Sequence, residues 1–310
     1  MFPSARLDRR SLLRALAAAG AAALLRPGRA IAQSTPLLTR RIPSTGEELP
    51  LVGLGSWGTF NVGEDRVARD ACAAVMRGFF DAGGRLIDCS PMYGSSQPVI
   101  GYGLEQLGMP ARLFSADKVW TSSGDEGSAQ IEASRRAWGV PRFDLLQVHN
   151  LLAWEEHLPT LFAMKAAGKL RYVGITTSHG RRHAEFERVM RSQPLDFVQF
   201  SYNILDREVE DRLLPLARER GMAVIVNRPF QRGDLIRRYA GTRLPAWAAD
   251  IDCTSWPQFL LKFIVSHPAV TCAIPATSSV AHVVENLGAA RGRLPDEALR
   301  RRMIEFVRSV

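Results

Sequence analysis

Cysteine is scarce in this sequence, and its few copies are widely spaced. Only four of the 310 residues are cysteines, and no two of them form a C-x-x-C pair. A disulfide framework or a cysteine-based metal cluster needs pairs at short, regular spacings. Because free cysteine behaves as a small apolar side chain, we expect four buried thiols. They are Cys72, Cys89, Cys253 and Cys272.

The sequence also lacks the spacings that zinc sites and serine hydrolases require. Its six histidines include one close pair, His179 and His183, and that pair has no glutamate beside its first member, although a helical zinc motif needs one. Ser56, Ser95 and Ser96 stand outside any G-x-S-x-G turn, which is where such a hydrolase holds its nucleophile. We expect neither a metal site nor a serine hydrolase site.

Positive charge is present but is not spread evenly over the chain. The formal net charge is +9, and six arginines with one aspartate among residues 1–32 account for +5 of it. The remaining surplus is ordinary for a soluble domain, and no later basic run is interleaved with aromatic residues. With 46% hydrophobic residues the chain can bury a large core. We therefore expect a folded domain with no nucleic-acid partner.

The first 32 residues have the order of a targeting segment. The adjacent Arg9 and Arg10 precede the alanine-rich run Ala15–Leu25, and an A-x-A site ends at Ala32. This run is too short to span a bilayer, which needs about 20 residues. The arrangement resembles a twin-arginine export signal, whose machinery carries folded proteins across the inner membrane. This resemblance implies cleavage after Ala32, a periplasmic location and no stable membrane insertion after cleavage. The alternative interpretation of the segment is an amphipathic or uncleaved N-terminal helix.

After a short linker over residues 33–38, the pattern predicts a hairpin and then a series of βα units over residues 39–310. Thr39–Leu51 indicates a β-hairpin with Pro43–Gly46 as its turn. Amphipathic stretches alternate with short apolar runs from there on. The expected helical faces include Val67, Ala71, Val75 and Phe79, and Ala184, Phe186, Val189 and Met190.

Eight apolar runs are candidate strands, mostly one βα unit apart. They are Leu51–Gly55, Arg85–Asp88, Leu113–Lys118, Asp144–His149, Tyr172–Thr176, Phe197–Ser201, Ala223–Asn227 and Thr271–Pro275. Eight units fit an α/β fold of the closed (β/α)8 TIM barrel type, whose active site gathers at the carboxyl ends of the strands.

An open doubly wound sheet is the competing fold, because Gly53–Gly58 matches G-x-G-x-x-G after a strand. In a dinucleotide-binding fingerprint the third glycine already lies in a helix. Here Thr59–Asp65 intervenes before helical periodicity begins, which favours the barrel.

Ionisable residues close three successive strand candidates. Asp88, Lys118 and His149 each end an apolar run, and Tyr93 follows in the loop after Asp88. An ionisable group at the end of a buried strand is costly unless it is paired. We therefore expect these side chains to meet at the barrel rim.

These residues carry a resemblance to a known family. Asp88-x4-Tyr93-Gly94, then Asp117–Trp120, then Gln147–His149 is similar to the aldo-keto reductase family, with its Asp, Tyr, Lys, His tetrad in that order. The resemblance runs from the hairpin at Arg41 to Glu285 and Asn286.

The resemblance implies an NAD(P)H-dependent oxidoreductase that reduces aldehydes or ketones, reversibly, by hydride transfer. Tyr93 is then the general acid, Lys118 stabilises its phenolate, Asp88 positions Lys118, and His149 hydrogen-bonds the substrate oxygen. The partner is a small-molecule carbonyl compound. The alternative is a catalytically weak, cofactor-binding barrel that senses redox state or docks on a partner.

The resemblance also implies where NADP(H) or NAD(H) binds. Thr176, Thr177 and Gln199 would contact the nicotinamide carboxamide, and Thr176–Thr177 stands where the family usually has Ser-Asn. Asn227 occupies a position that commonly offers an aromatic ring for stacking, so hydrogen bonds or Phe230 must hold the nicotinamide instead.

The adenosine end falls on the loop after the last strand. The predicted contacts there are Thr277, Ser278, Ser279, His282, Glu285 and Asn286, with Arg232 reaching over from the loop after the seventh barrel strand. Many members have Lys or Arg where Ala276 and His282 stand, so a fixed cation for a 2′-phosphate is missing. Ser278 and Ser279 also suit a helix cap.

Overall fold

The computed structural model of the chain describes residues 36–310. The predicted export signal over residues 1–32, and the first part of the linker over residues 33–38, lie outside these residues. The predicted hairpin begins at residue 39 and pairs in antiparallel register, with Thr39 opposite Pro50. Its strands are β1 (Thr39–Arg41) and β2 (Glu48–Pro50).

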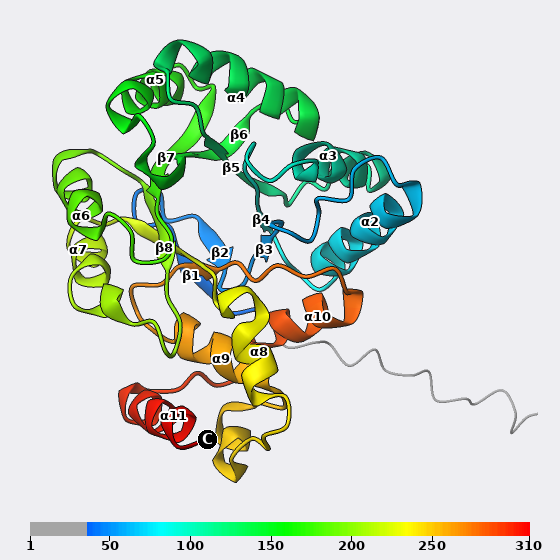
Figure 1. Cartoon of the computed structure of the whole chain (residues 1–310), viewed down its shortest axis with the longest axis vertical. Coiled ribbons are helices and arrows are strands. Elements are labelled where there is room, and N and C mark those ends of the chain that lie inside the picture. The colour runs from blue at the N-terminus through cyan, green and yellow to red at the C-terminus, as the bar shows by residue number, and fades with distance from the viewer. Residues whose placement is uncertain (1–35) are drawn as a thin grey trace, which may run out of the picture. The chain divides into compact units, whose positions relative to one another are not determined.

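Eight parallel strands follow, each at a position that the sequence predicts. They are β3 (Leu54–Gly55), β4 (Leu86–Asp88), β5 (Phe114–Val119), β6 (Phe143–Val148), β7 (Leu170–Thr176), β8 (Phe197–Ser201), β9 (Ala223–Asn227) and β10 (Cys272–Ala273). They pair in chain order, and parallel bridges from Val52 to Ala273 and from Gly55 to Ala276 join the last strand to the first. The (β/α)8 barrel is therefore confirmed (Figure 1).

Helices surround the strands in Figure 1. They are α2 (Arg66–Asp81), α3 (Ser96–Gln106), α4 (Gly124–Trp138), α5 (Trp154–Ala166), α6 (His183–Ser192), α7 (Leu213–Glu219), α8 (Asp234–Tyr239), α9 (Trp256–Val265), α10 (Val280–Gly288) and α11 (Glu297–Ser309). Short 3-10 turns are η1 (His149–Leu151), η2 (Glu208–Glu210), η3 (Gln231–Gly233) and η4 (Ala246–Ile251). No helix among residues 36–310 is long and apolar enough to cross a membrane.

Gly53 and Gly55, two of the three glycines in Gly53–Gly58, have a packing role in the barrel. A Cβ on Gly55 would lie 2.7 Å from the carbonyl oxygen of Ile274, and one on Gly53 would lie 2.9 Å from that of Leu86. The next helix starts only at Arg66, capped by Asp65, whose side chain accepts from the Ala68 N–H at 3.0 Å. These glycines therefore let the closing strands approach one another, and the doubly wound alternative is wrong.

The hairpin closes the amino-terminal end of the barrel. Ile42 and Leu49 belong to the same apolar cluster as barrel-interior residues such as Phe114 and Phe197. The hydroxyl of Tyr172 donates to Glu47 at 2.8 Å and lies 2.8 Å from the Thr45 hydroxyl. The carboxyl ends of the strands are therefore left as the accessible end.

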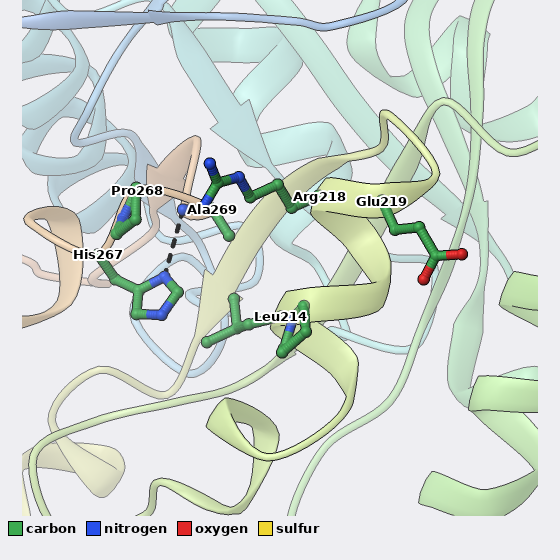
Figure 2. Close-up of a pocket in the computed structure, with 7 residues that line it drawn as sticks. Leu214, Arg218, Glu219, His267, Pro268 and Ala269 are labelled. Atoms are coloured by element: carbon green, nitrogen blue, oxygen red, sulfur yellow. Dashed lines mark hydrogen bonds between the residues drawn. The ribbon is translucent and has the colours of Figure 1, made fainter.

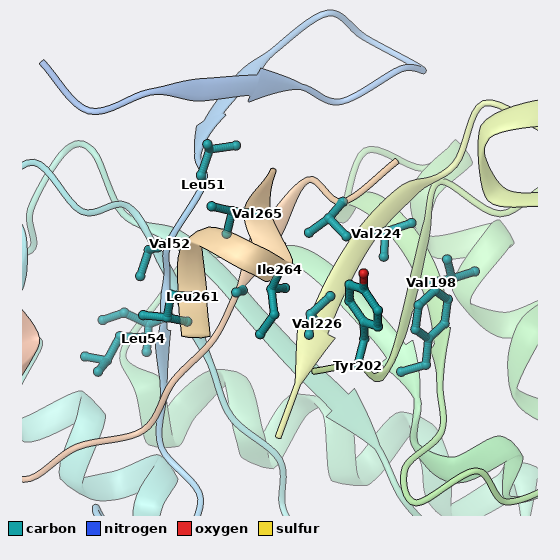
Figure 3. Packing of buried hydrophobic residues seen from close by; sticks show 14 of the residues in the cluster. Leu51, Val52, Leu54, Val198, Tyr202, Val224, Val226, Leu261, Ile264 and Val265 are labelled. Carbon is teal, nitrogen blue, oxygen red and sulfur yellow. The ribbon is translucent and has the colours of Figure 1, made fainter. Parts of the chain in front are cut away.

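A second apolar cluster fills the space between the strands and the helices. Figure 3 shows part of it, in which side chains of β3, β8 and β9 pack against Leu261, Ile264 and Val265 of α9. One buried lysine interrupts this layer: Lys262 Nζ donates to the carbonyls of Arg291 at 2.6 Å and Arg293 at 2.7 Å. All four cysteines are buried and free, as predicted.

Both predicted helical faces are partly wrong. In α2, Val75 and Phe79 are buried, but Ala71 is exposed and Val67 is 80% exposed. A strict i, i+4 series turns by about 40° around the helix at each step, because the helix has 3.6 residues per turn. Val67 and Ala71 therefore lie off the stripe that α2 buries through Val75, Met76 and Phe79. In α6, Phe186, Val189 and Met190 are buried. Ala184 is exposed, because it lies about 200° around the helix from Phe186.

Candidate active site

Lys118 and Asp88 form an ion pair inside the barrel. They come from the neighbouring strands β5 and β4, and Lys118 Nζ lies 2.6 Å from Asp88 Oδ2. Lys118 is 0% exposed and Asp88 is 2% exposed. Nζ also donates to the Cys89 carbonyl at 2.7 Å. Burial lowers the pKa of Lys118, but Asp88 and Tyr93 outweigh burial and the net pKa is raised, so the lysine is a fixed cation.

Tyr93 lies beside this cation. Its ring centroid is 5.2 Å from Lys118 Nζ, and burial raises the pKa of the phenol to about 12, an effect that the Lys118 ammonium opposes. The Tyr93 carbonyl accepts from the N–H of Ser96 at 3.2 Å and from its hydroxyl at 2.8 Å. Gly94 adopts a left-handed φ of +61°, and a Cβ there would collide with the side chain of Asn61. The loop therefore holds Tyr93 tightly at the strand ends.

His149 faces Tyr93 from the end of β6. The two rings meet edge to face, with centroids 5.8 Å apart. Ser90 Oγ lies 2.8 Å from His149 Nδ1. Burial, and then the charge of Lys118, lower the pKa of His149 well below its usual range, so the ring is neutral near pH 7. Ser90 was not predicted, although it follows the end of β4 two residues after Asp88.

A chain of amides extends from the ion pair to two other predicted residues. Gln199 Nε2 donates to Asp88 Oδ1 at 2.9 Å, and Asn227 Nδ2 lies 3.4 Å from Gln199 Oε1. Asn227 Nδ2 also donates to the Thr177 carbonyl at 3.0 Å, and Ser201 Oγ donates to Asn227 Oδ1 at 2.7 Å. The structure thus brings Gln199 and Asn227 to the tetrad, through contacts that the sequence pattern does not indicate.

The other predicted carboxamide contacts lie at the end of β7. Thr176 Oγ1 accepts from the Asn150 N–H at 3.0 Å, and Thr177 Oγ1 donates to the Arg181 carbonyl at 2.7 Å. Both threonines are buried. Each hydroxyl is therefore oriented by the backbone of a loop at the barrel mouth.

Arginines gather beyond these residues. Burial, Arg228, Arg232 and Arg181 together lower the pKa of His179, and Arg228 hydrogen-bonds His179 Nε2. The Arg232 guanidinium lies 4.3 Å from the ring centroid of Trp57, in the loop after β3. Within residues 36–310 none of these three arginines forms an ion pair with a carboxylate. This cationic rim suits an anionic group.

The residues predicted to contact adenosine, in the loop after β10 and in α10, differ in their solvent exposure. Ser279 caps α10, because its Oγ accepts from the His282 N–H at 3.4 Å. Thr277 Oγ1 accepts from the Ser279 N–H at 3.1 Å. Ser278 and His282 are exposed, Glu285 is half-buried and Asn286 is buried, while Phe230 packs against the core. The loop therefore has a preformed helix start, and its contacts to a nucleotide stay predictions.

A separate pocket of about 500 Å³ lies away from this site. Figure 2 shows it between α7 and the segment His267–Ala269 before β10, both on the amino-terminal side of their strands. Burial and nearby arginines lower the pKa of His267 to about 4.

At the opposite end of the barrel, near the active site, Trp57 is 43% exposed and Trp120 is 40% exposed. Among the described residues no three His, Cys, Asp or Glu side chains gather as metal ligands.

Comparisons with known proteins agree with this geometry. The profile of the Aldo/keto reductase family matches residues 51–302. Methylglyoxal reductase YeaE of Escherichia coli is 29% identical over 245 residues, 77% of this chain and 84% of that protein. The NADH-specific methylglyoxal reductase of Escherichia coli is 25% identical over 232 residues, 63% of this chain and 68% of that protein.

Among solved structures, an aldo-keto reductase from Klebsiella pneumoniae in complex with NADPH matches with a TM-score of 0.72 at 24% identity, over 87% of this chain and 95% of that one. The family match spans all eight barrel strands and the four residues of the tetrad. The chain therefore belongs to the aldo/keto reductase family.

Proposed function

We propose that this protein reduces aldehydes or ketones to alcohols with a nicotinamide cofactor, and that Tyr93 is the general acid. The observation that carries the proposal is the buried ion pair of Lys118 and Asp88 beside the Tyr93 ring. Both Escherichia coli relatives are named methylglyoxal reductases, which makes small aldehydes the first substrates to test. Oxidation of the reduced nicotinamide by methylglyoxal, followed by its absorbance, tests the proposal.

Each residue of the tetrad has a task in protonating the carbonyl oxygen. The phenol of Tyr93 stays protonated near pH 7 because burial raises its pKa to about 12. The Lys118 ammonium stabilises the phenolate that forms when the proton leaves, which makes the phenol a stronger acid in the transition state. If Ser90 donates to His149 Nδ1, the other ring nitrogen carries the proton and orients the substrate oxygen. Asp88 keeps Lys118 in place.

The residues at the barrel mouth fit a dinucleotide. The cofactor supplies the hydride when bound. Gln199, Asn227 and Thr177 present amide and hydroxyl groups next to the tetrad, which suits a carboxamide. Arg228 and Arg232 have no carboxylate partner among the described residues, which suits phosphate. The relatives' names include both NADH and NADPH, so NAD(P)H is the proposed cofactor.

Discrimination between NADPH and NADH should be weak. Ala276 and His282 supply no fixed cation for a 2′-phosphate, and the guanidinium of Arg232 lies on Trp57. We expect NADPH to be favoured by at most about tenfold, near 1.4 kcal/mol. Ala276→Lys should raise this preference, because a charge-assisted phosphate contact contributes about 1.5–3 kcal/mol. Dissociation constants from fluorescence quenching measure both.

The control for this prediction is Val284→Lys, which adds the same charge on an exposed position of α10. It should leave the ratio of the two dissociation constants unchanged. A wild-type preference for NADPH above about a hundredfold would mean that Arg232 or another cation already grips the phosphate.

A cofactor-binding sensor is the second candidate function, and Asn227 favours it. An amide stands where a stacking ring is common in the family, and it is bonded to Thr177 and Gln199. Tight binding of NADPH without turnover of any aldehyde in a broad panel would support the sensor. Turnover would support the enzyme.

We also propose export by the twin-arginine route, on the strength of Arg9, Arg10 and the A-x-A site that ends at Ala32. Replacing both Arg9 and Arg10 by lysine should abolish the periplasmic fraction without changing net charge. Replacing Arg26 and Arg29 by lysine is the matched control and should leave export intact. Immunoblots of periplasmic and cytoplasmic fractions measure both, and export of the first variant would contradict the route.

A further inference from the structure

A buried polar cluster lies on the outer side of β5, one residue before Lys118. Asp117 is fully buried. Its Oδ1 accepts from the backbone N–H of Lys118 at 2.7 Å, and its Oδ2 accepts from Gln97 Nε2 at 2.9 Å. The same amide nitrogen donates to Ser134 Oγ at 2.8 Å. Because successive strand residues point to opposite faces, Asp117 points out of the barrel, toward α3 and α4.

This cluster connects the strand of Lys118 to the segment of Tyr93. Gln97 lies in the first turn of α3. Its neighbour Ser96 holds the Tyr93 carbonyl through both its N–H and its hydroxyl. The hydrogen bond from Gln97 to Asp117 therefore ties the start of this helix, and with it the Tyr93 loop, to β5.

The carboxyl of Asp117 is kept in this place at a cost. Burial raises the pKa of Asp117 to about 7. The backbone N–H and the charge of Lys118 and the hydrogen bond from Gln97 lower this pKa, whereas the charge of Asp88 raises it. Cys89 is a further titratable group close to it, whereas α3 and α4 contribute the neutral amide and hydroxyl of the cluster. Apolar side chains would join the strand to these helices without the cost of burying a carboxyl.

We propose that Asp117 and Gln97 are positioning residues for proton transfer, because their hydrogen bond fixes the Tyr93 phenol against the Lys118 ammonium. This inference rests on the proposed function. Both side chains act through the tetrad, from behind β5. Breaking their bond lets Tyr93 move away from Lys118 and weakens the phenol as an acid, while the contacts at the barrel mouth stay intact.

Gln97→Met tests this directly, since methionine keeps the length of the side chain and removes its amide. With NADPH and methylglyoxal, kcat should fall about tenfold, the scale expected for a misplacement of less than 1 Å. KM and the dissociation constant of NADPH should stay within about twofold, because neither ligand touches this cluster. Ser134→Ala is the matched control: it removes a bond to the same amide that comes from α4 rather than from β5, and should keep kcat.

Asp117→Asn is the conservative variant. Its side-chain oxygen still accepts from the Lys118 N–H, and rotation of the Gln97 amide restores the second bond, so kcat should stay within about threefold of the wild type.

The melting temperature of Asp117→Asn supplies a readout that does not depend on turnover. A carboxyl whose pKa is raised in the folded state stabilises the fold below its unfolded pKa, and this contribution is lost as pH rises through about 7. The melting temperature of Asp117→Asn should therefore increase relative to that of the wild type as pH rises.

The possible failures are distinguishable. No reduction by the wild type would overturn the proposed function and this inference with it. Reduction at equal kcat by the wild type and a folded Gln97→Met would overturn the inference alone. A loss of kcat in Ser134→Ala equal to that in Gln97→Met, or a change in KM and NADPH affinity as large as that in kcat, would also overturn it, because both describe general loosening of the barrel.

Discussion

Tyr93→Phe is expected to lower kcat for aldehyde reduction by about 10²-fold or more, the scale of general acid catalysis. Phenylalanine keeps the ring that meets His149 edge to face but has no proton to give. Folding and NADPH affinity should survive, because the loop is held through the Tyr93 backbone rather than its hydroxyl. Steady-state rates, NADPH fluorescence quenching and thermal melting measure the three quantities.

Tyr172→Phe is the matched control at the other end of the barrel. It removes a hydroxyl that bonds Glu47 and Thr45, so it should lower the melting temperature and leave kcat unchanged. A Tyr93→Phe variant with near-native rates on a good aldehyde would remove Tyr93 from the role of general acid.

The strands and the tetrad were predictable because both depend on local pattern. Short apolar runs at regular spacing locate parallel strands, and an ionisable residue at the end of a buried run signals a partner at the same edge. Asp88 and Lys118 meet for this reason. His149 falls just past its strand, in a 3-10 turn, yet still at the rim where the barrel gathers its functional groups.

The two predicted helical faces were partly wrong, because a strict i, i+4 spacing does not stay on one side of a helix. Val67 and Phe79 are separated by about 120° of rotation around α2, so Val67 is exposed while Phe79 is buried. The buried stripe of α2 instead follows mixed i, i+3 and i, i+4 steps, as in Cys72, Val75, Met76 and Phe79.

Long-range polar contacts were the least predictable part of the site. The bond from Gln199 to Asp88 joins residues 111 positions apart, and no spacing rule indicates it. The cationic rim depends on left-handed backbone at Arg228 and Arg232, with φ of 52° and 62°, conformations that non-glycine residues seldom adopt. Only the folded chain brings these groups together.

Lys118→Met is expected to abolish turnover and to destabilise the fold. Methionine leaves the phenol of Tyr93 without its cation and leaves the Asp88 carboxylate unpaired among buried strands. Removing one partner of a buried pair costs about 3–5 kcal/mol, and the remaining bond from Gln199 to Asp88 offsets only part of this. Denaturant unfolding at neutral pH measures the free energy of unfolding, and NADPH oxidation measures the turnover.

The pH for the stability measurement follows from the pKa of Lys118. Burial lowers it, but Asp88 and Tyr93 raise it by more, so the net pKa lies above its usual value. A raised lysine pKa contributes stability that is fully present below the unfolded value of about 10.4 and is lost as pH rises through the folded one. The whole contribution of the pair is therefore present at neutral pH and should disappear in the variant there.

Lys262→Met separates the two effects, because Lys262 is equally buried but donates to two backbone carbonyls between α9 and the segment that follows α10. It should lower stability and keep kcat. Adding Asp88→Asn to Lys118→Met removes the unpaired charge, so stability should recover in part while turnover stays absent. Equal stability of Lys118→Met and the wild type would show that no buried pair forms, and retained turnover would show that Tyr93 donates its proton without this lysine.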